Sequence, residues 1–398
     1  MEYEDELLVF GDFIKGTCEL MCPVSERKMR EREKLLHPLE RQTQPVLPGE
    51  AVSERSHSSK GKIYLNRNEN YRADPDKIVK AFSRSAAGHK MPSPSDLRPF
   101  PSLMKTVSYL IEKVASCEIE ASAWVDRYNF VTDRLRAVRQ DMVIQGLPAA
   151  ECIKLLVPMV KFHVFAGYWL CGKPIHLYDP KINGSFLTEC IKRLLVMYNA
   201  VKGMEHPGSK PKGENTSTQE TEHCNNTEHL MNALYLIIGL GNPEVLNQAS
   251  EKLLYLKDCK CCVMHLAFQI SLASWRGNYV KVCSSMKTLT PLLCMAAALH
   301  LPSVRRHALM VMTTAYSNKV LKFPAALLQQ HLLWEDRHQV YKECQHYGIP
   351  VDKSQNTEPS VHFQKGTFDL NAKQIQPSRL FWIDNHLSNS TVAEILLN

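Results

Sequence analysis

The sequence lacks an uncharged stretch long enough to cross a membrane. Residues 262–275 are too few to span a hydrocarbon core of about 30 Å, and residues 288–304 carry Pro291 and Pro302. The N-terminus, Met1-Glu-Tyr-Glu-Asp-Glu-Leu, is acidic and has no basic segment followed by an apolar run, so we expect no signal peptide. These absences predict a protein with no membrane partner.

An excess of charge of one sign is also missing. The chain has 48 Lys and Arg residues against 41 Asp and Glu residues, a net charge of +7. This small excess allows an acidic partner or nucleic acid without requiring either. The 13 cysteines are an odd number in a chain of 398 residues without a secretion signal, which indicates reduced thiols and a cytoplasmic or nuclear location.

Motifs of common catalytic chemistry are absent as well. The sequence has no Gly-x-Ser-x-Gly elbow, His-Glu-x-x-His, phosphate loop or kinase signature. Cysteines come close together at Cys18-x-x-x-Cys22 and at Cys259, Cys261 and Cys262 with His265. Neither group has the paired short spacings of a zinc site. We therefore expect no enzymatic activity, no cofactor and no metal.

The first part of the chain reads as an arm. Residues 1–72 are predicted to form an extended arm and linker, because a charge-rich helix at residues 26–34 is followed by a Pro- and Ser-rich stretch. Asp74-Pro75-Asp76 then supplies a capping carboxylate and a first-turn proline. We expect a helix to begin there.

Apolar residues at helical spacing dominate the next part of the chain. Six of them recur every three or four residues: Trp124, Tyr128, Val131, Leu135, Val138 and Met142. They predict one long amphipathic helix. Further helices with short polar breaks indicate stacked antiparallel pairs, so we predict a helical-repeat domain over residues 73–300. Its polar stretch at residues 203–229 is expected to be a disordered insert.

The C-terminal part predicts a winged helix. Three short helices are expected at residues 304–316, 324–334 and 335–347. The alternation of Val361, Phe363 and Phe368 about Lys365-Gly366 then indicates a β-hairpin. Three helices and a hairpin are the outline of a winged helix, placed here at residues 301–371 with a tail at 372–398.

The third of these helices carries two positive residues, Arg337 and Lys342, and three negative ones, Glu335, Asp336 and Glu343. A helix that reads DNA needs a positive surplus. We therefore expect this winged helix to bind protein.

Four arginines flank the apolar stripe of the long amphipathic helix. Arg127 and Arg134 lie on one edge of the stripe, and Arg136 and Arg139 lie on the other. Their stems can cover the edge of the core while their charged heads stay in water. The alternative is a basic rim that binds an acidic partner segment or phosphates.

Four blocks of this sequence resemble the Sac-three/GANP family. In chain order they are Gly16-Thr-Cys-Glu-Leu-Met-Cys-Pro-Val-Ser-Glu-Arg-Lys-Met-Arg-Glu, Val79-Lys-Ala-Phe-Ser-Arg-Ser-Ala-Ala-Gly, Asp96-Leu-Arg-Pro-Phe-Pro-Ser-Leu-Met-Lys-Thr-Val-Ser-Tyr-Leu and Asp133-Arg-Leu-Arg-Ala-Val-Arg-Gln-Asp. The order is that of the family. Phe363-Gln-Lys-Gly-Thr-Phe and Phe381-Trp-Ile-Asp add a weaker likeness near the C-terminus.

The resemblance implies a mainly α fold, a PCI-like stack of helix pairs that ends in a winged helix. In the large members this region docks a PCI-domain subunit and a small acidic subunit at the nuclear pore for mRNA export. The short chain is similar to the small members associated with centrosomes. We therefore expect a scaffold in centrosome duplication and spindle assembly, located in cytoplasm, cytoskeleton, centrosome and spindle. A nuclear mRNA-export adaptor with RNA contact is the alternative.

The resemblance also marks candidate partner-binding residues. Arg27 and Arg30 lie in the first block, and Arg134, Arg136 and Arg139 in the fourth. The resemblance does not say whether they bind a partner or support the fold. With Arg127 they are the candidate partner-binding residues, while Cys18, Met21, Cys22 and Pro23 are expected to pack the arm onto the helices.

Overall fold

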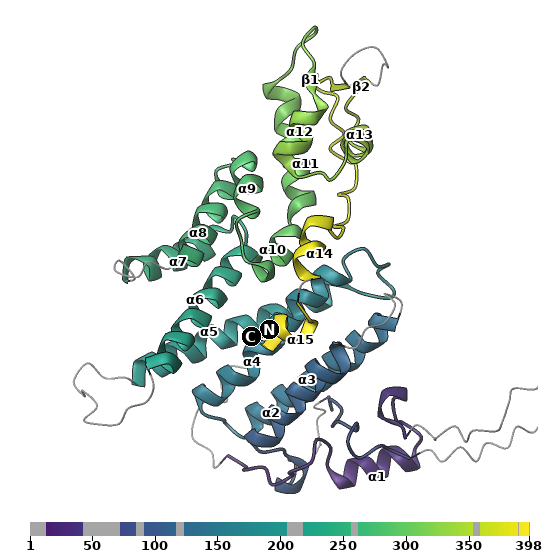
Figure 1. Cartoon of the computed structure of the whole chain (residues 1–398), viewed down its shortest axis with the longest axis vertical. Coiled ribbons are helices and arrows are strands. Elements are labelled where there is room, and N and C mark those ends of the chain that lie inside the picture. The colour runs from purple at the N-terminus through teal and green to yellow at the C-terminus, as the bar shows by residue number, and fades with distance from the viewer. Residues whose placement is uncertain are drawn as a thin grey trace, which may run out of the picture. The chain divides into compact units, whose positions relative to one another are not determined.

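A computed structural model describes residues 13–42, 72–84, 91–116, 123–204, 218–255, 262–352, 359–388 and 390–397. The chain divides into two units, Met1–Glu151 and Cys152–Asn398. Both are built mainly from helices, and the second holds a small sheet, which confirms the expected fold class at this level (Figure 1).

The first unit is organised around the long helix α3. Its elements are α1 (Val24–Arg32), the 3-10 turns η2 (Pro38–Glu40) and η3 (Pro94–Asp96), α2 (Phe100–Tyr109), the π-helical turn η4 (Leu110–Ala115) and α3 (Ala123–Ile144). All six stripe residues of α3 are buried, which confirms the predicted amphipathic helix. Helix α2 and the turn η4 pack against α3. Gly146, with φ of 55°, lies just beyond the C-terminal end of α3.

Residues 13–42 belong to this unit. Cys18, Met21 and Cys22 are buried, as expected of a segment that packs onto the helices. The backbone N–H of Cys18 donates to the carbonyl of Leu97 (3.0 Å), and that of Lys80 donates to the carbonyl of Met21 (3.0 Å). The boundary predicted at residue 72 therefore differs from the observed division, because contacts distant in sequence hold this segment. Residues 43–71 lie outside the described part of the chain.

The helix expected to begin at Asp74 does not form. Asp74-Pro75-Asp76 begins a single turn, and residues 78–84 have no regular secondary structure. The N–H of Val79 donates to the Glu40 carboxylate (3.1 Å), and that of Phe82 to the Asp133 carboxylate (3.2 Å). These tertiary hydrogen bonds replace the ones that a helix would have made.

The second unit begins within helix α4 and stacks its helices in succession. Its helices are α4 (Ala149–Trp169), α5 (Pro180–Met204), α6 (Thr218–Ile238), α7 (Pro243–Tyr255), α8 (Cys262–Trp275), α9 (Tyr279–Met286), α10 (Pro291–Ala298), α11 (Leu301–Ala315), α12 (Ala325–Leu332), α13 (Arg337–His346), α14 (Phe381–Leu387) and α15 (Val392–Leu397). Helix α6 packs on α8, and α8 packs on α9. Helix α4 is buried over most of its length and contains Pro158.

The polar stretch at residues 203–229 is helical at both ends. Helix α5 continues to Met204, and α6 begins at Thr218. The ammonium of Lys202 pairs with the carboxylate of Glu228 at 2.8 Å, which joins the two helices at this end. The expected disordered insert is therefore wrong for its helical ends, and residues 205–217 lie outside the described residues.

A three-stranded antiparallel sheet lies among the C-terminal helices, with the strand order β1–β3–β2. The strands are β1 (Phe323–Pro324), β2 (Val351–Asp352) and β3 (Ser360–Val361). Val361 faces Phe323 on one side and Val351 on the other. The predicted hairpin about Lys365-Gly366 is therefore misplaced, because β3 pairs with strands that precede it, and Phe368 stacks on Tyr347 instead.

The predicted C-terminal tail is folded onto the second unit. Leu380, Ile383 and Leu396 are buried. The Tyr168 hydroxyl of α4 accepts a hydrogen bond from the N–H of Leu380 (2.8 Å). The Arg379 guanidinium lies 3.6 Å from the ring centroid of Trp169. Aromatic side chains of α4 therefore hold the segment that leads into α14.

Candidate functional site

The buried carboxylate of Glu40 binds two of the candidate arginines. Glu40 has no exposed surface, and its carboxylate pairs with Arg30 of α1 and with Arg134 of α3 (3.2 Å). Burial alone would raise the pKa of Glu40, but the two guanidinium groups outweigh burial and hold this pKa below its usual range. Burial likewise opposes the charge of Arg30, yet Glu40 raises the pKa of that guanidinium. We call these three residues the Glu40 cluster.

A second buried carboxylate, that of Asp141, lies on α3 about two turns beyond Arg134. It accepts hydrogen bonds from the ammonium of Lys80 (2.6 Å) and from Nε of Arg98 (2.7 Å). Nη1 of Arg98 also donates to the carbonyl of Met21 (3.2 Å). Arg98 and Asp141 have no exposed surface. Helix α3 thus carries two buried charge clusters, and together they attach the N-terminal segments to it.

The structure places Arg30, Arg127 and Arg134 inside the first unit. Each has an exposed fraction below a tenth, and Nη1 of Arg127 donates to the carbonyl of Val114 at 2.7 Å. Their charged heads neither lie in water nor form a rim at the surface, which corrects both interpretations of these positions. The sequence could not indicate this, because the carboxylate that binds Arg134 is 94 residues away.

Arg27, Arg136 and Arg139 remain accessible at the surface of the first unit. All three side chains are partly exposed. The Arg136 guanidinium lies 3.8 Å from the centroid of the Phe82 ring, a cation–π geometry. These three side chains are the part of the candidate set that a partner can reach.

A second candidate surface, absent from the sequence predictions, is a small hollow of about 200 Å³ on the second unit. It lies between α9, α11, β1 and α12. Its lining is mainly apolar and aromatic: Tyr279, Val280, Met312, Tyr316, Phe323, Leu327, Leu328, His331 and Leu332. We call it the apolar groove.

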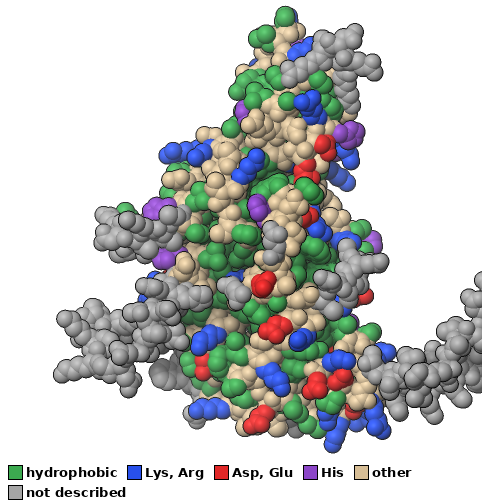
Figure 2. Space-filling model, viewed as in Figure 1, with side chains coloured by type: hydrophobic (Ala, Val, Ile, Leu, Met, Phe, Trp, Pro, Cys, Tyr) green, Lys and Arg blue, Asp and Glu red, His purple; other side chains and the backbone are tan. Residues whose placement is uncertain are grey.

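The loop between α11 and β1 presents two large aliphatic side chains to solvent. Val320 is 82% exposed and Leu321 is 71% exposed. The Asn318 side-chain oxygen accepts hydrogen bonds from both of their N–H groups at 2.8 Å, so the loop has a defined turn. Figure 2 shows hydrophobic side chains at the tip where Figure 1 places this loop. Apolar side chains gathered at a surface are typical of protein contacts.

Basic side chains border this surface. Lys319 is exposed beside the aliphatic pair, and His331 is partly exposed in the lining of the groove. Lys322 is paired with Asp352. The one sequence signal for this surface is the aliphatic pair between two lysines, but sequence spacing does not show which apolar residues stay exposed.

Metal ligands do not gather in the described part of the chain. No group of three or more His, Cys, Asp and Glu side chains is arranged there to hold a metal ion. Cys18 and Cys22 are buried free thiols, and burial raises the pKa of Cys22 to about 12. Cys259 and Cys261 lie outside the described residues. No helix of the described residues is long and apolar enough to cross a membrane.

Comparison with known proteins gives a family match over most of the chain. The profile of the SAC3/GANP family matches residues 21–353. The chain is 24% identical to SAC3 family protein 1 of Schizosaccharomyces pombe over 403 residues, which covers 96% of this chain and 34% of that protein.

Two further relatives match shorter parts. Protein xmas of Drosophila melanogaster is 28% identical over 198 residues, covering 48% of this chain and 8% of that protein. SAC3 family protein B of Arabidopsis thaliana is 31% identical over 158 residues, covering 40% and 8%. The chain therefore spans about a third of the length of the first of these relatives and less than a tenth of the other two.

Proposed function

The chain belongs to the SAC3/GANP family, and we propose that it is a non-catalytic scaffold that joins protein partners in nuclear mRNA export. The observation that carries this proposal is the family match over residues 21–353, which runs through both units. The matched stretch contains both charge clusters of α3 and the whole apolar groove. The export role is the one that the resemblance implies for the large members of the family.

We propose the apolar groove and the adjacent loop as the docking surface for a PCI-domain subunit. An apolar surface with a basic border suits a partner helix with an apolar face and acidic flanks. The exposed Val320 and Leu321 would become buried in such a complex, which is favourable by about 25 cal/mol per Å² of apolar surface. We further infer that α11, α12, α13 and the small sheet form the winged helix of a PCI-like fold.

The centrosome and spindle role stays a prediction of the resemblance to the small family members, and it competes directly with the export proposal. The two roles differ in location and in partners. Export predicts a nuclear rim, a PCI-domain partner and RNA close to the complex. A centrosomal scaffold predicts foci at the spindle poles and co-purification with centrosomal proteins.

The test compares three endogenously tagged forms of the full chain through one cell cycle. These are the unchanged protein, the double variant Val320→Glu with Leu321→Glu, and the control Val196→Glu. Val196 is 56% exposed on α5 and does not line the groove, so its replacement is a matched change at an exposed valine. Each form is imaged with markers for nuclear pores and centrosomes, purified for mass spectrometry and crosslinked to RNA.

For the unchanged and control forms we expect localisation at the nuclear rim and co-purification of a PCI-domain protein. The double variant should lose both while keeping its thermal stability. Foci only at the spindle poles would contradict the export role. Retention of the PCI-domain partner by a folded double variant would contradict the docking surface.

A further inference from the structure

A serine followed by proline lies at the surface of the first unit, where the turn η3 begins. The sequence contains two Ser-Pro or Thr-Pro pairs, Ser93-Pro94 and Thr290-Pro291. Proline-directed protein kinases phosphorylate a serine or threonine that has proline immediately after it, and they bind the surrounding segment in an extended conformation. The fold therefore decides which of the two pairs such a kinase can reach.

Ser93 meets both conditions for recognition by such a kinase. Its φ of −74° and ψ of 159° are extended, which is the conformation that a following proline favours. Ser93 and the two residues after it are exposed, and Met91 is 73% exposed. The turn η3 that follows is three residues long, so only a short element has to open when a kinase binds this segment.

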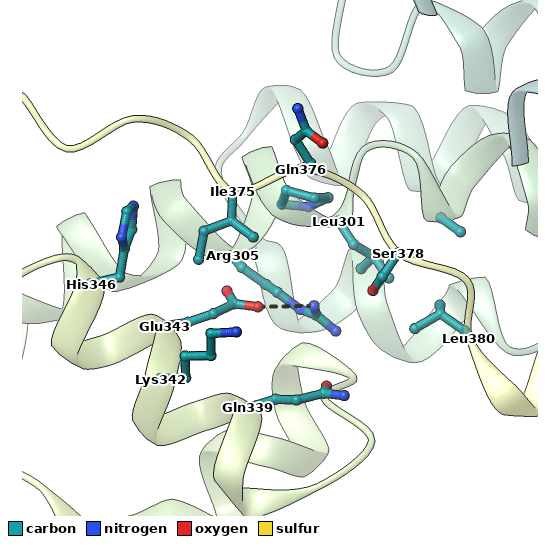
Figure 3. A pocket seen from close by; sticks show the side chains of 12 residues that line it. Leu301, Arg305, Gln339, Lys342, Glu343, His346, Ile375, Gln376, Ser378 and Leu380 are labelled. Carbon is teal, nitrogen blue, oxygen red and sulfur yellow. Dashed lines mark hydrogen bonds and ion pairs between the residues drawn. The ribbon is translucent and has the colours of Figure 1, made fainter. Parts of the chain in front are cut away.

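Two other positions next to a proline are unsuited to such a kinase. Thr290 is exposed, but helix α10 begins at Pro291 and its residues Leu292–Ala298 are all buried, so the helix would have to unfold. Ser378 is exposed on a segment without regular secondary structure, beside a cavity of about 360 Å³ (Figure 3). Its neighbour Pro377 precedes it, which is the reverse of the required order.

The Ser93 hydroxyl makes a hydrogen bond that a phosphate would remove. It donates to Oδ2 of Asp96 at 2.6 Å, and the backbone N–H of Ser93 donates to the same oxygen at 3.3 Å. The hydroxyl bond is the main reason that the pKa of Asp96 lies below its ordinary value. A phosphorylated serine has no hydroxyl hydrogen to donate, and it carries a charge of about −1.5 to −2 at neutral pH. Like charges would then face each other at this turn.

The turn that contains this carboxylate also holds the segment that leads into α1. The other carboxylate oxygen, Oδ1, accepts a hydrogen bond from the Ser25 hydroxyl of α1 at 2.9 Å. The backbone N–H of Thr17 donates to the carbonyl of Pro94 (2.8 Å), and that of Cys18 donates to the carbonyl of Leu97 (3.0 Å). Repulsion at η3 would therefore act on the attachment of the N-terminal segment.

A phosphate orders a segment when an uncommitted cation lies opposite it, and it breaks contacts when a carboxylate does. The carboxylate of Asp96 lies within hydrogen-bonding distance of Ser93. The ammonium of Lys80 also contacts this turn, at the carbonyl of Asp96 (2.6 Å), but it is paired with the buried carboxylate of Asp141 at 2.6 Å. The local charges therefore favour disruption.

We propose that Ser93 is a phosphorylation site for a proline-directed kinase, and that the phosphate loosens the attachment of the N-terminal segment to η3. In the reaction the Oγ of Ser93 attacks the γ-phosphorus of ATP. The Oγ–P bond forms, the bond between that phosphorus and the bridging oxygen breaks, ADP leaves, and the hydroxyl proton passes to the catalytic aspartate of the kinase. This site goes beyond the proposed function, because it requires neither the apolar groove nor an export role.

The experiment incubates the purified full chain with Mg²⁺, ATP and a panel of cyclin-dependent and mitogen-activated protein kinases. A synthetic peptide of residues 91–100 reports whether each kinase accepts the segment outside the fold. Ser93→Ala removes the acceptor, and Pro94→Ala removes the recognition signal but keeps the carbonyl that Thr17 uses. The matched control is Ser95→Ala, because Ser95 is an exposed serine of the same turn that no proline follows.

Tandem mass spectrometry should locate a single phosphoryl group at Ser93 in the unchanged chain and in the Ser95→Ala control. The Ser93→Ala and Pro94→Ala variants should take up none. Thr290 and Ser378 should stay unmodified in all forms.

Hydrogen exchange then measures the attachment of the N-terminal segment. In the phosphorylated chain the amides of Thr17 and Cys18 should exchange about tenfold faster, as the loss of a hydrogen bond to a charged group predicts. Ser93→Ala loses the hydroxyl bond without adding charge, so its increase should be smaller. Amides of α8 in the second unit serve as the internal reference and should not change.

Three results would overturn the proposal. One is a peptide that no kinase of the panel phosphorylates at Ser93. Another is phosphorylation of the peptide but not of the folded chain, which would show that the fold shields this serine. The third is complete phosphorylation with no faster exchange at Thr17 and Cys18 than Ser93→Ala shows, which would mean that the added charge does not act on the attachment.

Discussion

Each unit contains a buried glutamate, Glu40 in the first and Glu343 in the second, and their pKa values shift in opposite directions. Glu40 in the first unit faces two guanidinium groups, and its pKa is lowered despite burial. Glu343 in the second unit faces one, that of Arg305, and burial raises its pKa above its ordinary value. Burial also lowers the pKa of Arg305. One counter-charge does not offset the loss of water around a carboxylate here, whereas two do.

The difference matches what each carboxylate connects. Glu40 links α1, the segment at Val79 and α3, which are separate in sequence. Glu343 and Arg305 join two helices, α11 and α13, and the neighbouring Leu332 and Val340 are fully buried. In the first unit a buried charge cluster therefore joins three separate segments beside their apolar contacts, whereas in the second unit the buried ion pair joins two helices that pack through apolar side chains.

The largest expected effect comes from Glu40→Gln. It leaves Arg30 and Arg134 buried without their counter-charge, which typically costs about 3–5 kcal/mol of unfolding free energy. The matched change Glu343→Gln should cost about 1–2 kcal/mol, because Arg305 keeps its two carbonyl acceptors. Urea unfolding of both variants measures the difference. Equal losses would contradict the comparison.

The next largest effect is expected from Leu135→Ala, which removes a fully buried side chain from the stripe of α3. The loss should be about 2–5 kcal/mol, the usual range for a buried leucine. Leu328→Ala on α12 is the matched change in the second unit, where Leu328 is also fully buried. Amide hydrogen exchange should show each loss within its own unit. A negligible thermal shift for Leu135→Ala would mean that this face of α3 is not core.

Acidification should affect the two carboxylates in opposite directions. The pKa of Glu40 is lowered from 4.5 in the fold, so its stabilising contribution is present above 4.5 and is lost as pH falls through the folded pKa. The pKa of Glu343 is raised from 4.5, so its contribution is present below 4.5 and is lost as pH rises through the folded pKa.

Urea midpoints of the unchanged protein, Glu40→Gln and Glu343→Gln, followed from neutral pH downward, measure this contrast. The advantage of the unchanged protein over Glu40→Gln should shrink on acidification. Its stability relative to Glu343→Gln should rise. The same direction for both comparisons would show that the second counter-charge is not what separates the two sites.

The smallest effect on stability is expected from the accessible arginines. Reversing Arg136 and Arg139 to Glu removes the contact of Arg136 with Phe82 and should cost about 1 kcal/mol or less. Arg134→Glu should instead unfold the N-terminal segments, because Arg134 belongs to the Glu40 cluster. If the accessible side chains bind a partner, the double reversal should weaken pull-down of that partner from a folded protein. Unchanged pull-downs would leave these arginines without a binding role.

Hydrophobic spacing predicts the long helix α3 correctly. The buried stripe from Trp124 to Met142 follows from spacing alone. The sequence predictions fail where a segment pairs with residues that are distant in the sequence. Asp74-Pro75-Asp76 has a helix start signal, but the following N–H groups find Glu40 and Asp133 instead. The hairpin fails for a similar reason, since Val361 pairs with Phe323 and Val351 rather than with residues beyond Lys365-Gly366.

The candidate sites show the same limit. Arg134 is one of the candidate partner-binding residues predicted from the sequence, yet in the fold its carboxylate partner is Glu40, in the segment predicted to be an arm. The apolar groove combines residues of α9, α11, β1 and α12, so no local motif marks its lining.

Helix positions in this protein are local properties, because hydrophobic spacing and capping residues act within a few turns. Family membership is readable for the same reason, since its blocks are contiguous. Burial of Arg30 and Arg134 and exposure of Val320 and Leu321 belong to the folded chain alone. They depend on which groups meet across long sequence separations, and a charge is satisfied or free according to what folding brings next to it.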